Sequence, residues 1–422
     1  MSERRRLFEL IVLGGSAFIL SKAVFSYIFD RPWPPTVGNQ PWELVLAISY
    51  TGLVLILIPW YRETQFVLRR NLSLVAMVLL ALLSSLWAHM PYLVLRKSIG
   101  LYGATLLGVA FAARLSFPDQ LGVMNWLFRT IAVLSLAFVV FLPKLAVTEE
   151  GQWMGVFEYK NALGSMLGLG ALVEWQRPAE SRGSKILKII AFLLYAVLLV
   201  HADSVTPLIA LFGAVLLIES YKFATFRLRL PLYVFGLATL IMVAIGFTFV
   251  VANGDSVMNM VGRSSNLTGR TEIWSLALSF VPQKPILGYG YSGFWLGASP
   301  ESFVINRIMR GWIMYAHNGY LEQQLNLGIV GLALTLTFLG IGVKRALKLS
   351  RRHSDATLWP LAFLFYFILH NTVECTIMIQ DIEWALCVSC IAGADPLLFS
   401  FHVQEEEEMS EERPLLPIEE PI

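Results

Sequence analysis

Long apolar runs alternate with short polar or basic segments along most of this 422-residue chain. A helix that crosses the hydrocarbon core of a bilayer needs roughly 20 predominantly apolar residues, and many of these runs approach that length. The pattern predicts transmembrane helices at residues 7–29, 42–60, 72–88, 93–113, 124–142, 160–176, 186–201, 204–220, 231–252, 317–340, 357–374 and 382–400. We therefore expect an all-α polytopic membrane protein of about 12 transmembrane helices.

Charged residues are too sparse for a set of soluble domains. The chain is 56% hydrophobic and only 15% charged, whereas soluble domains carry about 25% charged residues. With the N-terminus inside and the spans alternating, every short inside loop is basic, as the positive-inside bias requires. The charges are segregated by loop, so the net charge of +2 does not indicate nucleic-acid binding. Both termini are predicted to be cytoplasmic.

The spans divide the chain into four parts. Residues 1–252 hold the first nine predicted spans, and residues 317–403 hold the last three. Between them, residues 253–316 form a large loop on the outside, with apolar stretches that indicate short helices on or in the membrane surface. Loops of this length within a compact fold are usually functional. Residues 404–422 are rich in glutamate and proline, which predicts a disordered acidic tail in the cytoplasm.

A histidine stands where the long loop meets the tenth predicted span, in the sequence Ala316-His317-Asn318-Gly319-Tyr320-Leu321-Glu322. The other five histidines have less informative settings, in loops, in the tail or at span ends. An imidazole at this place can accept a proton from a hydroxyl near neutral pH. The structural alternative is a residue at a helix end that is bonded to a loop carbonyl.

Cations enter the outer membrane face from three separate segments. Arg96 and Lys97 lie near the outer end of the fourth span, Lys160 at the outer end of the sixth, and Arg270 in the long loop. Ionisable residues at membrane depth are costly and are functional candidates by default, although long cationic side chains also snorkel to the interface. Because arginine suits bidentate binding of phosphate oxygens, the four indicate an outward-facing anion site.

Three other kinds of site are not supported. Carboxylates are few in the long loop, and no metal-binding motif appears, so a metal site is not expected. Cys375, Cys387 and Cys390 form no framework of disulfides. The sequence Gly288 to Gly293 fits the dinucleotide-binding pattern of glycines, but that pattern is meaningful only between a strand and a helix. We interpret it as a stretch of turns.

Four short stretches, in this order, resemble the O-antigen ligase and polymerase family of bacterial envelope glycan assembly. They are Trp87 to Lys97, Phe157 to Gly164 (FEYKNALG), Gly269 to Trp274 (GRTEIW), and Ala316 to Glu322 (AHNGYLE) followed by Gly328. The second stretch looks most like the exopolysaccharide polymerase branch, where histidine often precedes Lys-Asn. Tyr159 takes that place here, so no catalytic role is carried over to it.

The resemblance implies a fold like that of the metal-independent membrane glycosyltransferases, without a cofactor, in the bacterial inner membrane. It implies a substrate of undecaprenyl diphosphate that carries a glycan. Flippase and chain-length or export proteins of the same pathway are candidate partners. We expect His317 and Arg270 to be catalytic, Arg96, Lys97, Lys160 and Arg270 to bind the diphosphate, and Asn161, Asn318, Tyr320 and Glu322 to orient the substrate.

Other functions remain open from the sequence alone. Within the family, a polymerase joins lipid-linked repeat units, whereas a ligase moves the finished glycan to lipid A core. A polysaccharide or lipid-linked sugar transporter, or flippase, also suits many spans, but transporters commonly show repeated halves and charges at the bilayer midplane. We find neither pattern. A non-enzymatic scaffold is a third class.

Overall fold

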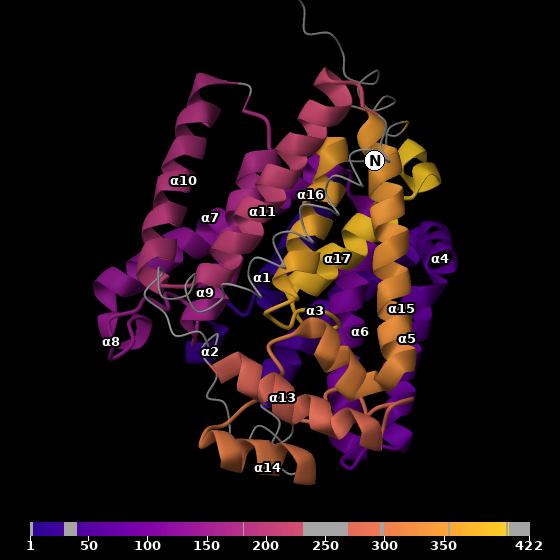
Figure 1. Ribbon diagram of the computed structural model, residues 1–422. Coiled ribbons are helices and arrows are strands. Elements are labelled where there is room, and N and C mark those ends of the chain that lie inside the picture. The colour runs from indigo at the N-terminus through magenta and orange to yellow at the C-terminus, as the bar shows by residue number, and fades with distance from the viewer. Residues whose placement is uncertain are drawn as a thin grey trace, which may run out of the picture.

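The computed structural model describes residues 3–28, 40–179, 181–230, 269–295, 299–352, 355–401 and 404. Its long helices run side by side, and two short ones close one end of the bundle (Figure 1). Within the described residues the chain is helical and forms no named strand; a single antiparallel bridge joins Val147 and Trp153. The helices are α1 (Glu3–Leu20), α2 (Phe25–Ile28), α3 (Gln40–Leu57), α4 (Tyr61–Arg70), α5 (Leu72–Leu83), α6 (Pro91–Arg114), α7 (Phe117–Phe141), α8 (Pro143–Ala146), α9 (Lys160–Gln176), α10 (Arg182–Ala202), α11 (Val205–Lys222), α13 (Arg270–Phe280), α14 (Pro300–Met309), α15 (Gly319–Leu349), α16 (Asp355–His370) and α17 (Ile382–Gly393).

In the described part of the chain, six helical stretches are long and apolar enough to cross a membrane. They are Pro41–Arg70, Pro91–Arg114, Phe117–Phe141, Arg182–Ala202, Val205–Thr225 and Gly319–Arg352, and three shorter apolar helices accompany them. The predicted all-α, polytopic membrane architecture is confirmed at this level. The count of twelve stays a prediction. The ninth predicted span at 231–252, the loop residues 253–268 and the tail from 405 lie outside the described residues.

Several predicted spans differ in their bounds from the helices observed, and for two of them the local cause is plain. The first, 7–29, is interrupted after α1, because Lys22 and Val24 adopt left-handed backbone angles (φ 60° and 67°). The second, 42–60, does not end at residue 60. A 3-10 turn leads directly into α4, which carries the helix on to Arg70. The apolar pattern missed α4 because this helix is amphipathic and holds several charged residues.

The centre of the bundle is formed by α17 and the second half of α6. Every residue of α17 is buried, as is α6 from Gly103 onwards. At Gly108 a side chain would clash with the backbone, since a Cβ atom there would lie 2.4 Å from the carbonyl oxygen of Ala385. Trp384 Nε1 also donates a hydrogen bond to Thr105 Oγ1 over 2.9 Å. These close contacts fix α17, and with it the segment that leads into it.

The opposite end from the N-terminus is closed by α13 and α14 (Figure 1). A second apolar cluster forms there, including Tyr289, Phe294, Trp295 and Leu325. Gly328 kinks α15 with φ 64° and ψ −164°, where a Cβ atom would lie 2.2 Å from the backbone carbon of Ile286. The kink therefore lets the segment after α13 pack against α15. This packing holds α13 over the end of the bundle.

Candidate functional site

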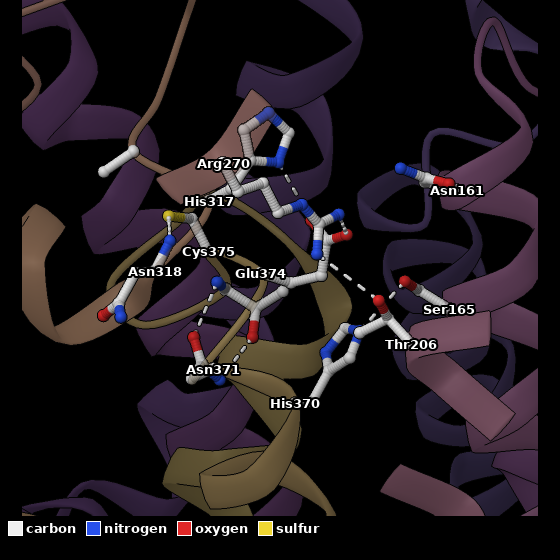
Figure 2. Close-up of polar contacts among 12 residues, drawn as sticks. Asn161, Ser165, Thr206, Arg270, His317, Asn318, His370, Asn371, Glu374 and Cys375 are labelled. Carbon is white, nitrogen blue, oxygen red and sulfur yellow. Dashed lines mark hydrogen bonds and ion pairs between the residues drawn. The ribbon is translucent and has the colours of Figure 1, made fainter. Parts of the chain in front are cut away.

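Arg270 is the first residue of α13 and is only 8% exposed. Its Nη2 donates to Glu374 Oε1 over 2.6 Å, and its Nη1 donates to Thr206 Oγ1 over 3.4 Å (Figure 2). Glu374 follows α16 and Thr206 lies in the first turn of α11, so one guanidinium joins three separate parts of the chain. A nearly buried arginine of this kind is costly unless it is paired.

His317 lies on the other side of the same carboxylate. Its Nδ1 is 3.6 Å from Glu374 Oε2, and the imidazole is 23% exposed (Figure 2). The ring of Tyr315 packs against it with the ring centres 4.4 Å apart. The structure therefore brings the two predicted catalytic residues, Arg270 and His317, to one glutamate.

The backbone around His317 is held from both sides. His317 has φ 50°, a conformation that residues other than glycine seldom adopt and that is often found at functional sites. The neighbouring Ala316 accepts a hydrogen bond from Trp274 Nε1 at its carbonyl oxygen (2.8 Å) and donates one from its nitrogen to Glu322 Oε2 (2.9 Å). On the other side, Asn318 N donates to Cys375 Sγ. These contacts offset the cost of the strained backbone.

The position of Glu374 is set by the segment between α16 and α17. The side-chain oxygen of Asn371 accepts hydrogen bonds from Thr376 N and Ile377 N, and its carbonyl oxygen accepts one from Gly319 N (2.8 Å). A Cβ atom at Gly319 would lie 2.4 Å from Asn371 Oδ1, so this glycine permits the approach. Burial tends to raise the pKa of Glu374, but His317 and the charge of Arg270 outweigh it and hold that pKa below its ordinary value.

The predicted substrate-orienting residues of α15 make bonds within the protein. Asn318 Oδ1 caps the helix by accepting from Tyr320 N and Leu321 N. Tyr320 OH donates to the carbonyl oxygen of Ile368. Glu322 is 6% exposed and also accepts a hydrogen bond from Trp295 Nε1. These side chains hold the segment around His317, and contact with a substrate stays a prediction.

Of the other predicted cations, Lys160 lies at the border of the Arg270 site, whereas Arg96 and Lys97 lie elsewhere, on α6. Lys160 starts α9, and its Nζ lies 3.3 Å from Asp203 Oδ2, whereas the next residue, Asn161, accepts a hydrogen bond from Ser204. Asp203 and Ser204 stand just before Thr206 in the chain, and Thr206 accepts a hydrogen bond from Arg270. The start of α9 therefore borders the Arg270 site. Arg96 lies instead 3.6 Å from Glu43 of α3, and Lys97 is exposed on α6.

A second buried network lies beneath the first and was missed in the sequence. His370 Nε2 lies 3.1 Å from Ser165 Oγ, and its Nδ1 lies 3.1 Å from Glu383 Oε2. His370 is 0% and Glu383 1% exposed. Glu374 was missed as well. His370, Glu374 and Glu383 share a signal in the sequence: each is an ionisable residue within or next to an apolar span. Burying such a side chain costs energy, so it is a functional candidate.

The chemistry of the site is that of cations, a carboxylate and an imidazole. Within the described ranges, no group of three or more His, Cys, Asp or Glu side chains is placed to hold a metal ion. One guanidinium can bind an anion, and the imidazole beside a carboxylate can accept a proton. The arrangement is suited to a group transfer in which the guanidinium binds an anionic leaving group and the imidazole takes a proton from the acceptor.

Comparison with known proteins adds two matches. Residues 190–336 match the family model described as O-antigen ligase, a stretch that includes both Arg270 and His317. The exopolysaccharide production protein ExoQ of Rhizobium meliloti (strain 1021) is 25% identical over 123 residues, which cover 26% of this chain and 27% of the length of ExoQ. These matches confirm that the chain resembles the O-antigen ligase and polymerase family, as the sequence motifs indicated.

Proposed function

We propose that this protein transfers a glycan from undecaprenyl diphosphate to a sugar hydroxyl on the periplasmic face of the bacterial inner membrane, and thereby polymerises repeat units of exopolysaccharide or O antigen. The family match supports a ligase or polymerase, and the relationship to an exopolysaccharide production protein favours the polymerase. The observation that carries the proposal is the convergence of Arg270 and His317 on Glu374.

Arg270 binds the diphosphate of the donor in this mechanism. A guanidinium has five N–H donors, and the two contacts with Glu374 and Thr206 occupy only part of them. The remaining donors stabilise the negative charge that develops as the diphosphate leaves, an effect worth roughly 3 kcal/mol per well-placed donor. Lys160 at the border of the site adds positive charge when phosphate oxygens compete with Asp203 for it.

His317 takes the proton of the acceptor hydroxyl. Because Nδ1 faces the carboxylate of Glu374, the neutral imidazole carries its proton on Nδ1 and its lone pair on Nε2. Nε2 accepts the hydroxyl proton while the hydroxyl oxygen bonds to the anomeric carbon. The bond from that carbon to the phosphate oxygen breaks, and its electron pair leaves with the diphosphate. Attack from the opposite face inverts the anomeric centre, and Glu374 stabilises the imidazolium.

The proposed topology places both termini in the cytoplasm. The basic inside loops support it, and so does the position of α13 and α14 at the end of the bundle away from the N-terminus. A donor delivered to that end requires a flippase, and the product requires chain-length or export proteins. Both are proposed partners.

The test is chain growth by purified protein on undecaprenyl-diphosphate-linked repeat units alone. We expect the natural protein to build long glycans and Arg270→Ala to lower the rate about 100- to 1,000-fold, as for the loss of an oxyanion-stabilising donor. Arg307→Ala is the matched control, since Arg307 is exposed on α14 in the same segment. Equal activity of both variants rules out this enzymatic role and favours a transporter or scaffold.

The same assay separates polymerase from ligase. No chain growth on repeat units alone, followed by transfer once lipid A core is added, establishes the ligase alternative. In that case Arg270 and His317 keep the same roles, because both reactions release the same diphosphate.

A further inference from the structure

A cavity opens on the side of the bundle near the end that carries the N-terminus, away from the candidate site. Its volume is about 540 Å³, and it is lined by residues of α7 and by Arg177, which follows α9. The start of α7 is tied to that end by the ion pair of Asp119 with Arg6, 3.0 Å apart. The cavity is therefore separate from the Arg270 site.

Two guanidinium groups line this cavity together with an amide and a hydroxyl. Arg129 uses Nε and Nη2 to bind Glu174, at 3.0 and 2.6 Å, and Arg177 Nη1 donates to Asn125 Oδ1 at 3.1 Å. Among the described residues, Nη1 of Arg129 and both Nε and Nη2 of Arg177 have no protein acceptor. Arg129 is thus paired with a carboxylate, whereas Arg177 is bonded to a neutral amide, so the lining keeps a positive charge with unused donors.

Apolar side chains continue from the cavity along the outer face of α7. Trp126 and Val133 line it and are 55% and 58% exposed. α7 is one of the helices long and apolar enough to span the membrane, so these side chains face lipid. Tryptophan is favoured at the level of the lipid headgroups, where its ring is half apolar and half polar. The cavity thus joins a basic, hydrogen-bonding part to an apolar, lipid-facing part.

We propose that this cavity binds the phosphate of an anionic phospholipid, with the acyl chains along α7. Basic pockets between transmembrane helices are suited to such headgroups, and each cation near the surface is worth about 1 kcal/mol. A phosphodiester accepts from the unused N–H groups of Arg129 and Arg177, and Thr130 adds a hydroxyl to the same lining. This site is independent of the proposed glycan transfer.

The test measures bound lipid by native mass spectrometry of the full-length protein in detergent. Phosphatidylglycerol and phosphatidylcholine are added in separate samples. We expect phosphatidylglycerol to be retained preferentially and Arg177→Gln to weaken that binding about fivefold, which corresponds to about 1 kcal/mol. Glutamine keeps an amide to bond Asn125, and Arg177 is exposed, so this variant is expected to fold.

The matched control is Arg182→Gln at the exposed start of α10, which does not line the cavity. Equal losses in the two variants mean that the attraction is general surface charge, and they overturn the proposal. Equal retention of phosphatidylcholine by the natural protein overturns it too. Displacement of phosphatidylglycerol by millimolar inorganic phosphate shows an anion site without lipid specificity and rejects the phospholipid as its ligand.

Discussion

Two histidines, each beside a glutamate, differ in what surrounds them. His317 is 23% exposed and lies 3.6 Å from Glu374, which also holds a guanidinium. His370 is fully buried, 3.1 Å from Glu383, and its other ring nitrogen contacts Ser165. The second set has the residue types of a serine hydrolase triad, but burial keeps substrate and water from it. In the proposed mechanism, accessibility, more than residue type, separates the reacting histidine from the structural one.

The buried pair supports the exposed one. His370 ends α16, bonds to Glu383 of α17 and to Ser165 of α9, and its carbonyl oxygen accepts a hydrogen bond from Glu374 N. The helix α9 also carries Lys160 at its start. The network at His370 therefore links the segment that holds Glu374 to the helix that borders the site.

Replacing each histidine with alanine tests this difference most strongly. We expect His317→Ala to lower the rate of chain growth about 100- to 10,000-fold, the range for a lost general base, with little change in Tm. We expect His370→Ala to destabilise the fold by roughly 3–5 kcal/mol, because it leaves Glu383 buried without its partner. The measurements are single-turnover rates and thermal unfolding.

Added imidazole sharpens this comparison. It should restore part of the rate of His317→Ala, where the vacated space is accessible, and none of the rate of His370→Ala. A His370→Ala variant that keeps its natural Tm but loses activity would reverse the two assignments.

The ionisation of Glu374 predicts a distinct pH dependence. Its pKa lies below the ordinary value, so the folded state favours the carboxylate. The stability that this provides is complete above the unfolded pKa of about 4.3 and is lost as the pH falls through the lower folded pKa. The Tm difference between the natural protein and Glu374→Gln should be constant from about pH 6 to 8 and shrink below about pH 4.

Glu374→Gln should also slow chain growth about 10- to 100-fold at neutral pH, by analogy with the loss of a carboxylate that orients a histidine. A Tm difference that instead grows on acidification contradicts the assigned ionisation.

A pair of glycine substitutions gives the smallest expected effect. Gly319→Ala places a Cβ atom 2.4 Å from Asn371 Oδ1 and should cost about 1–3 kcal/mol of stability, as overpacking does. It should also lower activity, because it displaces the segment that holds Glu374. Gly340→Ala in the same helix meets nothing within 4 Å and is expected to stabilise by about 0.5–1 kcal/mol. The measurement is the thermal unfolding of both variants. Equal changes in Tm for the two would mean that the contact of residue 319 with Asn371 is not tight.

The sequence alone determined the helical membrane architecture and the nature of the candidate site. Apolar runs are local features, so α9 and the apolar body of α6 could be predicted closely. The amphipathic α4 could not be, because its pattern lacks a long apolar run. His317 and Arg270 were found from their places at the edge of apolar segments and from short motifs that are themselves local.

Only the tertiary structure decided which charges meet. Arg270 and Glu374 are separated by 104 residues in the chain and 2.6 Å in space, and their pairing depends on how α13 packs over the loop between α16 and α17. The same holds for Arg96, which contacts Glu43, and for Ser165 with His370. Hydropathy along a chain reports which residues leave water, whereas the partner of a buried charge is set by the packing of distant helices, because only that packing brings opposite charges within reach of each other.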